Sequence, residues 1–190
     1  MMICKVSELR KPAAFLTDRR GNALMEFAFA LPVLMLLLLG CLETTRYVLI
    51  QQKLDRASAS VADLVAQADS ISQSEVEAII GLTGQMMQPY DFANDGVVIV
   101  TSVTEDVDDG PMVQWQVDGA GILSAASVIG MVDDPAVMPT GFGMRDAETV
   151  IVTEIFYTFR PWIFDRFFPE QTIYRLSVRR PRLGGLSTLS

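Results

Sequence analysis

The order of apolar and polar residues predicts a membrane-spanning helix near the start of the chain. A basic segment precedes an uncharged run from Phe27 to Leu42, which includes four consecutive leucines. With flanking residues from Asn22 the run gives about 31 Å of helix at about 1.5 Å per residue, matching a bilayer core. Its Leu, Val and Phe residues favour insertion by about 3 to 6 kcal/mol, more than Glu26 costs near the end of the segment. We predict a transmembrane helix at residues 22–42.

The helical pattern continues after the apolar run. Apolar residues recur every three or four positions, and no proline or glycine interrupts residues 41–70. We predict one helix of about 45 residues with an amphipathic outer half. Its stripe should pack on the chain's own sheet, with an intermolecular coiled coil as the alternative. The stripe consists of Tyr47, Ile50, Leu54, Ala57, Val61, Leu64 and Ala68.

The remaining sequence predicts a short helix and four strands. Ser74 and Glu77 have the spacing of a capping box, so a helix is expected over residues 75–87, ending before Pro89. Residues 118–146 are expected to be mostly loop, with a short helix at 122–132 as the alternative. Four strands without long intervening helices favour an antiparallel sheet packed on the long helix, an α+β fold. The predicted strands are 97–103, 112–117, 148–159 and 172–178.

Charge predicts the orientation of the chain in the membrane. Residues 1–21 carry a net charge of +3 and the remaining residues −11. By the positive-inside rule, residues 1–21 form a cytoplasmic leader and residues 43–190 an extracytoplasmic domain. The length of 190 residues suits one compact domain beside the span. The acidic balance argues against nucleic-acid binding, which requires a basic surface.

The residue types present argue against an enzyme. The chain has no histidine, so neither a His-based triad nor a His-ligated metal site can form. The acidic segments at 106–110 and 133–135 have the composition of turns and lack the spacing of a calcium loop. No glycine-rich phosphate loop is visible in the sequence. We therefore expect no catalytic residues, no metal and no cofactor.

Two groups of side chains leave alternatives open. The first gathers between the last two strands and is expected to pack in the core, with an exposed partner surface as the alternative. It contains Trp162, Ile163, Phe164, Phe167 and Phe168. The second is a strip of arginines that could meet an acidic partner or a phosphate-bearing surface, or form a solvated edge strand. It contains Arg175, Arg179, Arg180 and Arg182.

The junction before the span carries the most specific signal. Arg19 and Arg20 precede Gly21, and Glu26 enters the apolar run five residues after that glycine. This spacing resembles the cleavage motif of type IV pilin-like precursors, which implies cleavage after Gly21 and a new amino terminus at Asn22. Glycine suits an extended backbone entering a protease site, while the arginines hold the leader at the cytoplasmic surface. An amine of the same or a neighbouring subunit could then compensate the Glu26 carboxylate.

The junction also resembles a narrower family. The sequence Glu-Phe-Ala-Phe-Ala-Leu-Pro from Glu26 to Pro32, followed by leucines, is similar to TadE-type pseudopilins of tight-adherence (Flp) pilus systems. The resemblance implies a pilin-like fold in the bacterial inner membrane with a periplasmic domain. It also implies a minor subunit that is processed by prepilin peptidase and required for pilus assembly or function. The implied partners are other pilins, pseudopilins and inner-membrane pilus assembly proteins.

Two other interpretations remain. Leu38 to Cys41 approximates a lipobox, which would make the chain a lipoprotein modified at Cys41. The long basic leader and Glu26 argue against this, and a small apolar helix residue is the preferred interpretation of Cys41. The chain could also be a membrane-anchored periplasmic adaptor or sensor domain.

Overall fold

The computed structural model describes residues 20–163, 165–166, 169–182 and 185–189, with side chains from residue 23 onward. The chain divides into two units, Met1–Leu42 and Glu43–Ser190. Helix α1 (Arg20–Ala66) contributes to both, and its 47 residues confirm the prediction of one long helix. Among the described residues, α1 is the one helix long and apolar enough to cross a membrane.

The second unit contains two further helices. A capping box starts α2 (Gln73–Met86), in which the Ser72 hydroxyl accepts from the Glu75 N–H and the Glu75 carboxylate accepts from the Ser72 N–H at 2.8 Å. The predicted cap at Ser74 is therefore wrong by two residues, although the helix itself is confirmed. A single turn, α3 (Phe92–Asp95), leads directly into the first strand.

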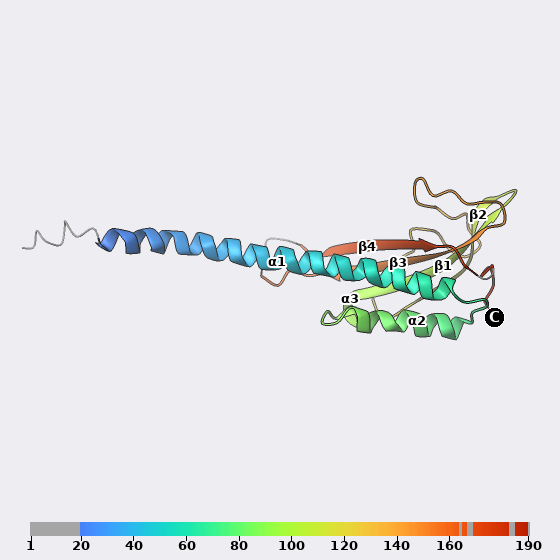
Figure 1. Cartoon of the computed structure of the whole chain (residues 1–190), viewed down its shortest axis with the longest axis horizontal. Helices are drawn as coiled ribbons and strands as arrows, with labels where there is room; N and C mark the ends of the chain where they lie inside the picture. Colours follow the sequence, from blue (N-terminus) through green and yellow to red (C-terminus); the bar gives the residue numbers. More distant parts are fainter. Residues whose placement is uncertain (1–19, 164, 167–168, 183–184, 190) are drawn as a thin grey trace, which may run out of the picture. The chain divides into compact units, whose positions relative to one another are not determined.

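Four strands form one antiparallel sheet in the order β2-β1-β3-β4. They are β1 (Gly96–Asp106), β2 (Gly110–Gly119), β3 (Thr149–Phe159) and β4 (Gln171–Arg179). All four predicted strands are present, and the first two form the predicted hairpin. The long helix followed by this sheet confirms the α+β fold class (Figure 1).

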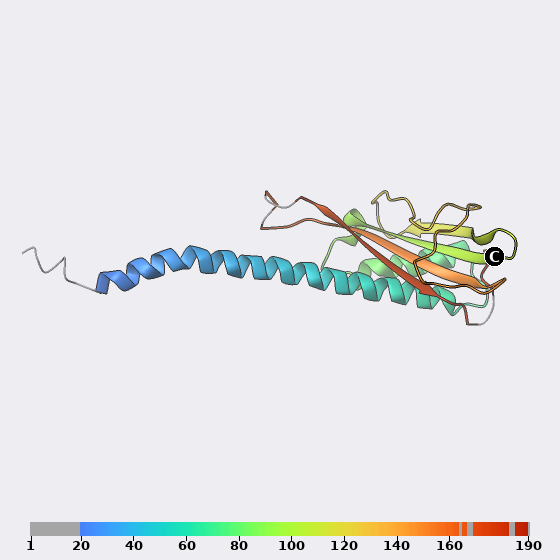
Figure 2. The ribbon, with the colours of Figure 1, turned by 90° about the horizontal axis from the view of Figure 1, so that it is seen from above.

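One face of the sheet packs on α1 and α2, which lie on the same side of it (Figures 1 and 2). Ile50, Leu54 and Val61 of α1 share a buried cluster with alternate residues of β1 and β3. Intramolecular packing of the stripe is thus confirmed. The prediction that Leu64 belongs to the buried stripe is wrong, because Leu64 is 39% exposed and the neighbouring Val65 is buried.

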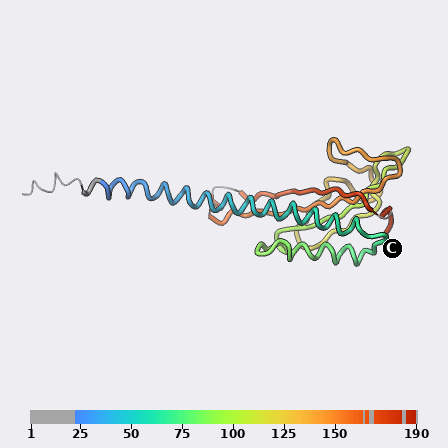
Figure 3. Tube along the Cα trace, in the orientation of Figure 1, coloured from blue at the N-terminus to red at the C-terminus, as the bar shows by residue number. Residues whose placement is uncertain are grey.

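The opposite face is covered by the long connection between β2 and β3. Ile129 and Ala136 from this connection bury the outward side chains Val150 and Val152. The trace of this segment lies on the side of the sheet away from α2 (Figure 3). The alternative of a helix at 122–132 is wrong, but the segment is more than a solvated loop, because it forms a third layer.

Candidate functional site

The predicted processing junction lies at the start of α1. The helix begins at Arg20, so the bond between Gly21 and Asn22 lies within its first turn, while Arg19 lies outside the described residues. The first N–H groups of a helix have no partner within the helix, so unwinding this turn for cleavage breaks few hydrogen bonds. Glu26 is exposed to solvent in the next turn.

The helix surface that follows the junction is apolar and uncovered. Every large apolar side chain from Leu24 to Leu38 is at least 43% exposed. An apolar surface of this extent is not stable in water and requires lipid or protein around it. The first unit is therefore suited to a single-pass membrane anchor.

A cluster of side chains links the part of α1 that opens the second unit, from Glu43 onward, to the start of the connection between β3 and β4. We call Glu43, Arg46, Arg160, Trp162 and Ile163 the Arg46–Trp162 cluster. The Glu43 carboxylate accepts from the backbone N–H groups of Trp162 and Ile163, both at 3.2 Å. The Arg46 guanidinium donates to the Arg160 carbonyl at 2.9 Å and lies 3.9 Å from the centre of the indole ring.

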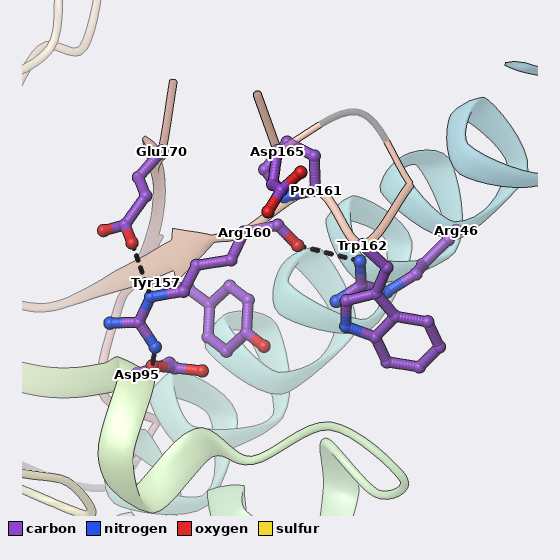
Figure 4. A pocket seen from close by; sticks show the side chains of 8 residues that line it. All are labelled: Arg46, Asp95, Tyr157, Arg160, Pro161, Trp162, Asp165 and Glu170. Carbon is purple, nitrogen blue, oxygen red and sulfur yellow. Dashed lines mark hydrogen bonds and ion pairs between the residues drawn. The ribbon is translucent and has the colours of Figure 1, made fainter. Parts of the chain in front are cut away.

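A pocket of about 680 Å³ opens beside this cluster (Figure 4). Within it, Arg160 forms ion pairs with Asp95 and with Glu170, the latter at 2.9 Å. The hydrogen bond to Glu170 and the negative charges of both carboxylates raise the pKa of Arg160 above its ordinary value. The other lining side chains are Arg46, Tyr157, Pro161, Trp162 and Asp165.

The Arg46–Trp162 cluster corrects one prediction. Trp162 is 74% exposed and Ile163 is 37% exposed, so the expectation that this aromatic segment packs in the core is wrong for Trp162. Phe164, Phe167 and Phe168 lie outside the described residues. Sequence reasoning did not link this segment to Glu43 and Arg46, because nothing local relates residues separated by about 120 positions.

A buried carboxyl group attaches the β2–β3 connection, the third layer described above and called the outer layer from here on, to the sheet. Glu154 of β3 is fully buried and accepts from the Ser127 hydroxyl, from the Val128 N–H at 2.9 Å and from the Tyr174 hydroxyl at 2.9 Å. Burial, with the negative charge of Glu154, raises the pKa of Tyr174 above its ordinary value. This group was not singled out in the sequence, where it reads as one polar position in a strand.

The C-terminal arginines lie on and beyond the edge strand β4. Arg175, Arg180 and Arg182 pair with Asp55, Glu148 and Asp63 at 2.7, 2.6 and 3.1 Å. The Arg179 side chain donates to the Val178 carbonyl. This supports the interpretation of a solvated edge strand over that of a strip directed at an outside partner.

The remaining predicted positions occupy ordinary surroundings. Asp106 accepts from the N–H groups of Asp108 and Asp109, which confirms a turn between β1 and β2. Cys41 is exposed on α1. Within the described ranges, no three acidic or cysteine residues are grouped so as to hold a metal ion.

Comparison with known families supports the resemblance drawn from the junction. Residues 21–63 match the family model described as TadE-like protein. No curated protein and no solved structure matches the chain. The matched segment begins at Gly21 and ends within α1, so it contains Gly21, Glu26 and the apolar run together with residues 43–63 of the second unit, but neither Arg19 nor Arg20.

Proposed function

From the TadE-like match over residues 21–63, we propose that this chain is a minor pilin-like subunit, a pseudopilin, of a tight-adherence pilus system. In this proposal prepilin peptidase cuts the chain after Gly21, and the mature subunit starts at Asn22. One membrane span follows, with the amino terminus at the cytoplasmic face of the inner membrane and residues 43–190 in the periplasm. The partners are other pilins, pseudopilins and inner-membrane assembly proteins.

The observation that carries the proposal is the start of the family match at Gly21, directly before an exposed apolar helix with one early acid. Cleavage there would change the electrostatics of Glu26. In the uncut chain Glu26 follows Arg20, the first residue of α1, by six positions. After cleavage it would follow a free amine by four positions, within reach of the positive end of the helix dipole. A new positive charge and the dipole would both lower the cost of a carboxylate at the membrane.

Processing is tested by intact-mass and N-terminal peptide analysis of the protein isolated from membranes of a strain with active prepilin peptidase. We expect the wild-type protein to begin at Asn22 and Gly21→Val to remain uncut. Gly40→Val is the matched control, because it changes a glycine of the same helix where a Cβ meets no atom within 4 Å. Processing of Gly21→Val to the wild-type extent would refute the cleavage proposal.

The same analysis separates the other interpretations. Lipid on Cys41, lost in Cys41→Ser, would make the chain a lipoprotein. An unprocessed amino terminus in the same strain would leave an anchored adaptor or sensor domain.

The role of Glu26 is tested separately from cleavage. We expect Glu26→Ala to be cut normally but to be depleted from assembled pilus complexes recovered by crosslinking and pull-down. Glu77→Ala, which removes an exposed acid from α2, should be recovered at the wild-type level. Equal recovery of Glu26→Ala and wild type would show that the charge pair is not needed for assembly.

A further inference from the structure

The Arg46–Trp162 cluster begins one residue after the apolar run. Glu43 follows Leu42 directly, and at about 1.5 Å per residue Arg46 lies about 6 Å farther along the helix axis than Leu42. A bilayer has about 5 to 7 Å of headgroup region on each side of its hydrocarbon core. If residues 22–42 span that core, as the proposed function requires, Glu43 and Arg46 lie in the headgroup region.

The start of the connection between β3 and β4, from Arg160 to Ile163, is held at the level of these two residues. Both oxygens of the Glu43 carboxylate are within 3.4 Å of the Trp162 N–H, and one also accepts from Ile163. Arg46 adds the bond to the Arg160 carbonyl and the stacking contact with the indole. Its side chain and that of Glu43 are 15% and 13% exposed, so this attachment is largely shielded from water.

The side chains presented at this level have the chemistry of a membrane interface. Trp162 is 74% exposed, whereas Trp115 is 6% exposed and donates its Nε1–H to the Leu186 carbonyl. Indole combines a large apolar ring with one polar N–H, and it concentrates where hydrocarbon meets headgroups. Ile163 adds an aliphatic side chain that is 37% exposed.

We infer that Trp162 and Ile163, at the start of the β3–β4 connection, form a second membrane contact of this protein, inserted among the phospholipid headgroups of the leaflet where the apolar run of α1 ends. The occupant of this surface is the lipid headgroup layer. Glu43 and Arg46 act as positioning residues that fix the depth of the indole. The inference rests on the proposed single-pass anchor but goes beyond it, because an anchor alone does not bring a loop into the bilayer.

The test uses the full chain reconstituted in vesicles of phosphatidylethanolamine and phosphatidylglycerol. Nitroxide quenchers are placed at the headgroup, near the top of the acyl chain or near its end. Because the chain has two tryptophans, the difference between wild type and Trp162→Phe isolates the emission of Trp162. We expect headgroup and shallow quenchers to reduce it about twofold more than the deep quencher. Emission of Trp115, measured in Trp162→Phe, should not respond to any of them.

A variant of the attachment gives a second measurement. Glu43→Ala removes the acceptor of both N–H groups, while Glu43→Gln retains one carbonyl oxygen. We expect quenching of Trp162 to fall at least about twofold in the alanine variant and to be largely kept in the glutamine variant. Quenching of Trp162 in Glu43→Ala as strong as in wild type would overturn the positioning role of Glu43.

The outcomes separate this inference from the proposed function. If the protein floats with the vesicles but no lipid quencher reduces Trp162 emission, the membrane contact is wrong and the anchor stands. A blue shift of Trp162 that grows with the protein-to-lipid ratio, without lipid quenching, would assign the surface to a second copy of the chain. Failure to float would refute the anchor and the contact together.

Discussion

Replacement of Glu154 by glutamine should strongly destabilise the second unit. The carboxyl group is fully buried and accepts three hydrogen bonds, two from the outer layer and one from Tyr174 of β4. Glutamine has nearly the same shape, so it leaves no cavity. Its one acceptor oxygen can keep the Val128 N–H and the Tyr174 hydroxyl, which donate to the same oxygen of Glu154. Its NH₂ group then faces the Ser127 hydroxyl, which must accept instead of donate.

The expected loss follows from the loss of the charged acceptor. A hydrogen bond to a charged group contributes about 1.5 to 3 kcal/mol, against about 0.5 to 1.5 kcal/mol for a bond between neutral groups. With all three bonds weakened in this way, the free energy of unfolding should fall by about 2 to 4 kcal/mol. Tyr174→Phe removes one donor and should cost about 2 kcal/mol. Because both changes act on the same bond, the double variant should lose at least about 1 kcal/mol less than the sum of the two.

Urea unfolding of the full chain in non-ionic detergent, followed by the emission of buried Trp115, measures these differences. Trypsin gives a second signal at Arg145, which lies in the outer layer and should be cut faster when that layer detaches. Asp118→Asn is the control, because Asp118 is exposed on β2 and, like Glu154, pairs with Ile99. It should stay within about 0.5 kcal/mol of wild type. A Glu154→Gln protein within about 1 kcal/mol of wild type would refute the structural role assigned to the carboxyl group.

Other changes test local packing and capping. Gly121→Ala would place a Cβ 2.1 Å from the Gly96 carbonyl oxygen and should cost more than about 2 kcal/mol in urea unfolding. Gly81→Ala, which meets no atom within 4 Å in α2, should be neutral or stabilising by up to about 1 kcal/mol; equal losses in both variants would contradict the packing. Ser72→Ala should cost about 1 kcal/mol by loss of the cap of α2. The Ser72 N–H and hydroxyl hold the pKa of Glu75 below 4.5, so Glu75 stabilises the fold above that pH and ceases to as pH falls through its folded pKa. The stability difference between wild type and Glu75→Gln should therefore narrow below pH 4.5, and a gap that persists in acid would rule out this linkage.

Much of the fold was predictable because its local signals are strong. A helix of 47 residues has many turns over which the apolar period repeats, and the two central strands, β1 and β3, each contain a run of β-branched residues. The cap of α2 was misplaced because Ser72–Glu75 and Ser74–Glu77 have the same spacing, and spacing alone cannot choose between them. Leu64 was misassigned for a similar reason, since Val65 also continues the stripe.

The sequence contains a signal that the sheet is covered on both faces, and therefore that an outer layer exists. Val97 to Val100 and Val150 to Val152 are continuous apolar runs, whereas a sheet with one solvated face alternates apolar and polar residues. Such runs require cover on both faces, and the Gly-, Ala- and Pro-rich connection supplies it. The Arg46–Trp162 cluster gave no comparable signal, because it depends on the tertiary fold bringing α1 next to the connection after β3.

The buried position of Leu186 has a consequence for the order in which the protein matures. Its carbonyl accepts from the Ser102 hydroxyl at 2.7 Å and from Trp115 Nε1 at 2.8 Å, while the Arg182 N–H reaches the last carbonyl of α1 at Ala66. A ribosome delivers a chain from its amino terminus, so the helices and all four strands emerge before these contacts can form. Until residue 186 arrives, two buried donors lack this acceptor and the core stays open on that side. A chain that is truncated before residue 186 therefore leaves part of its core accessible to proteases, and the core is completed only once residue 186 has been synthesised.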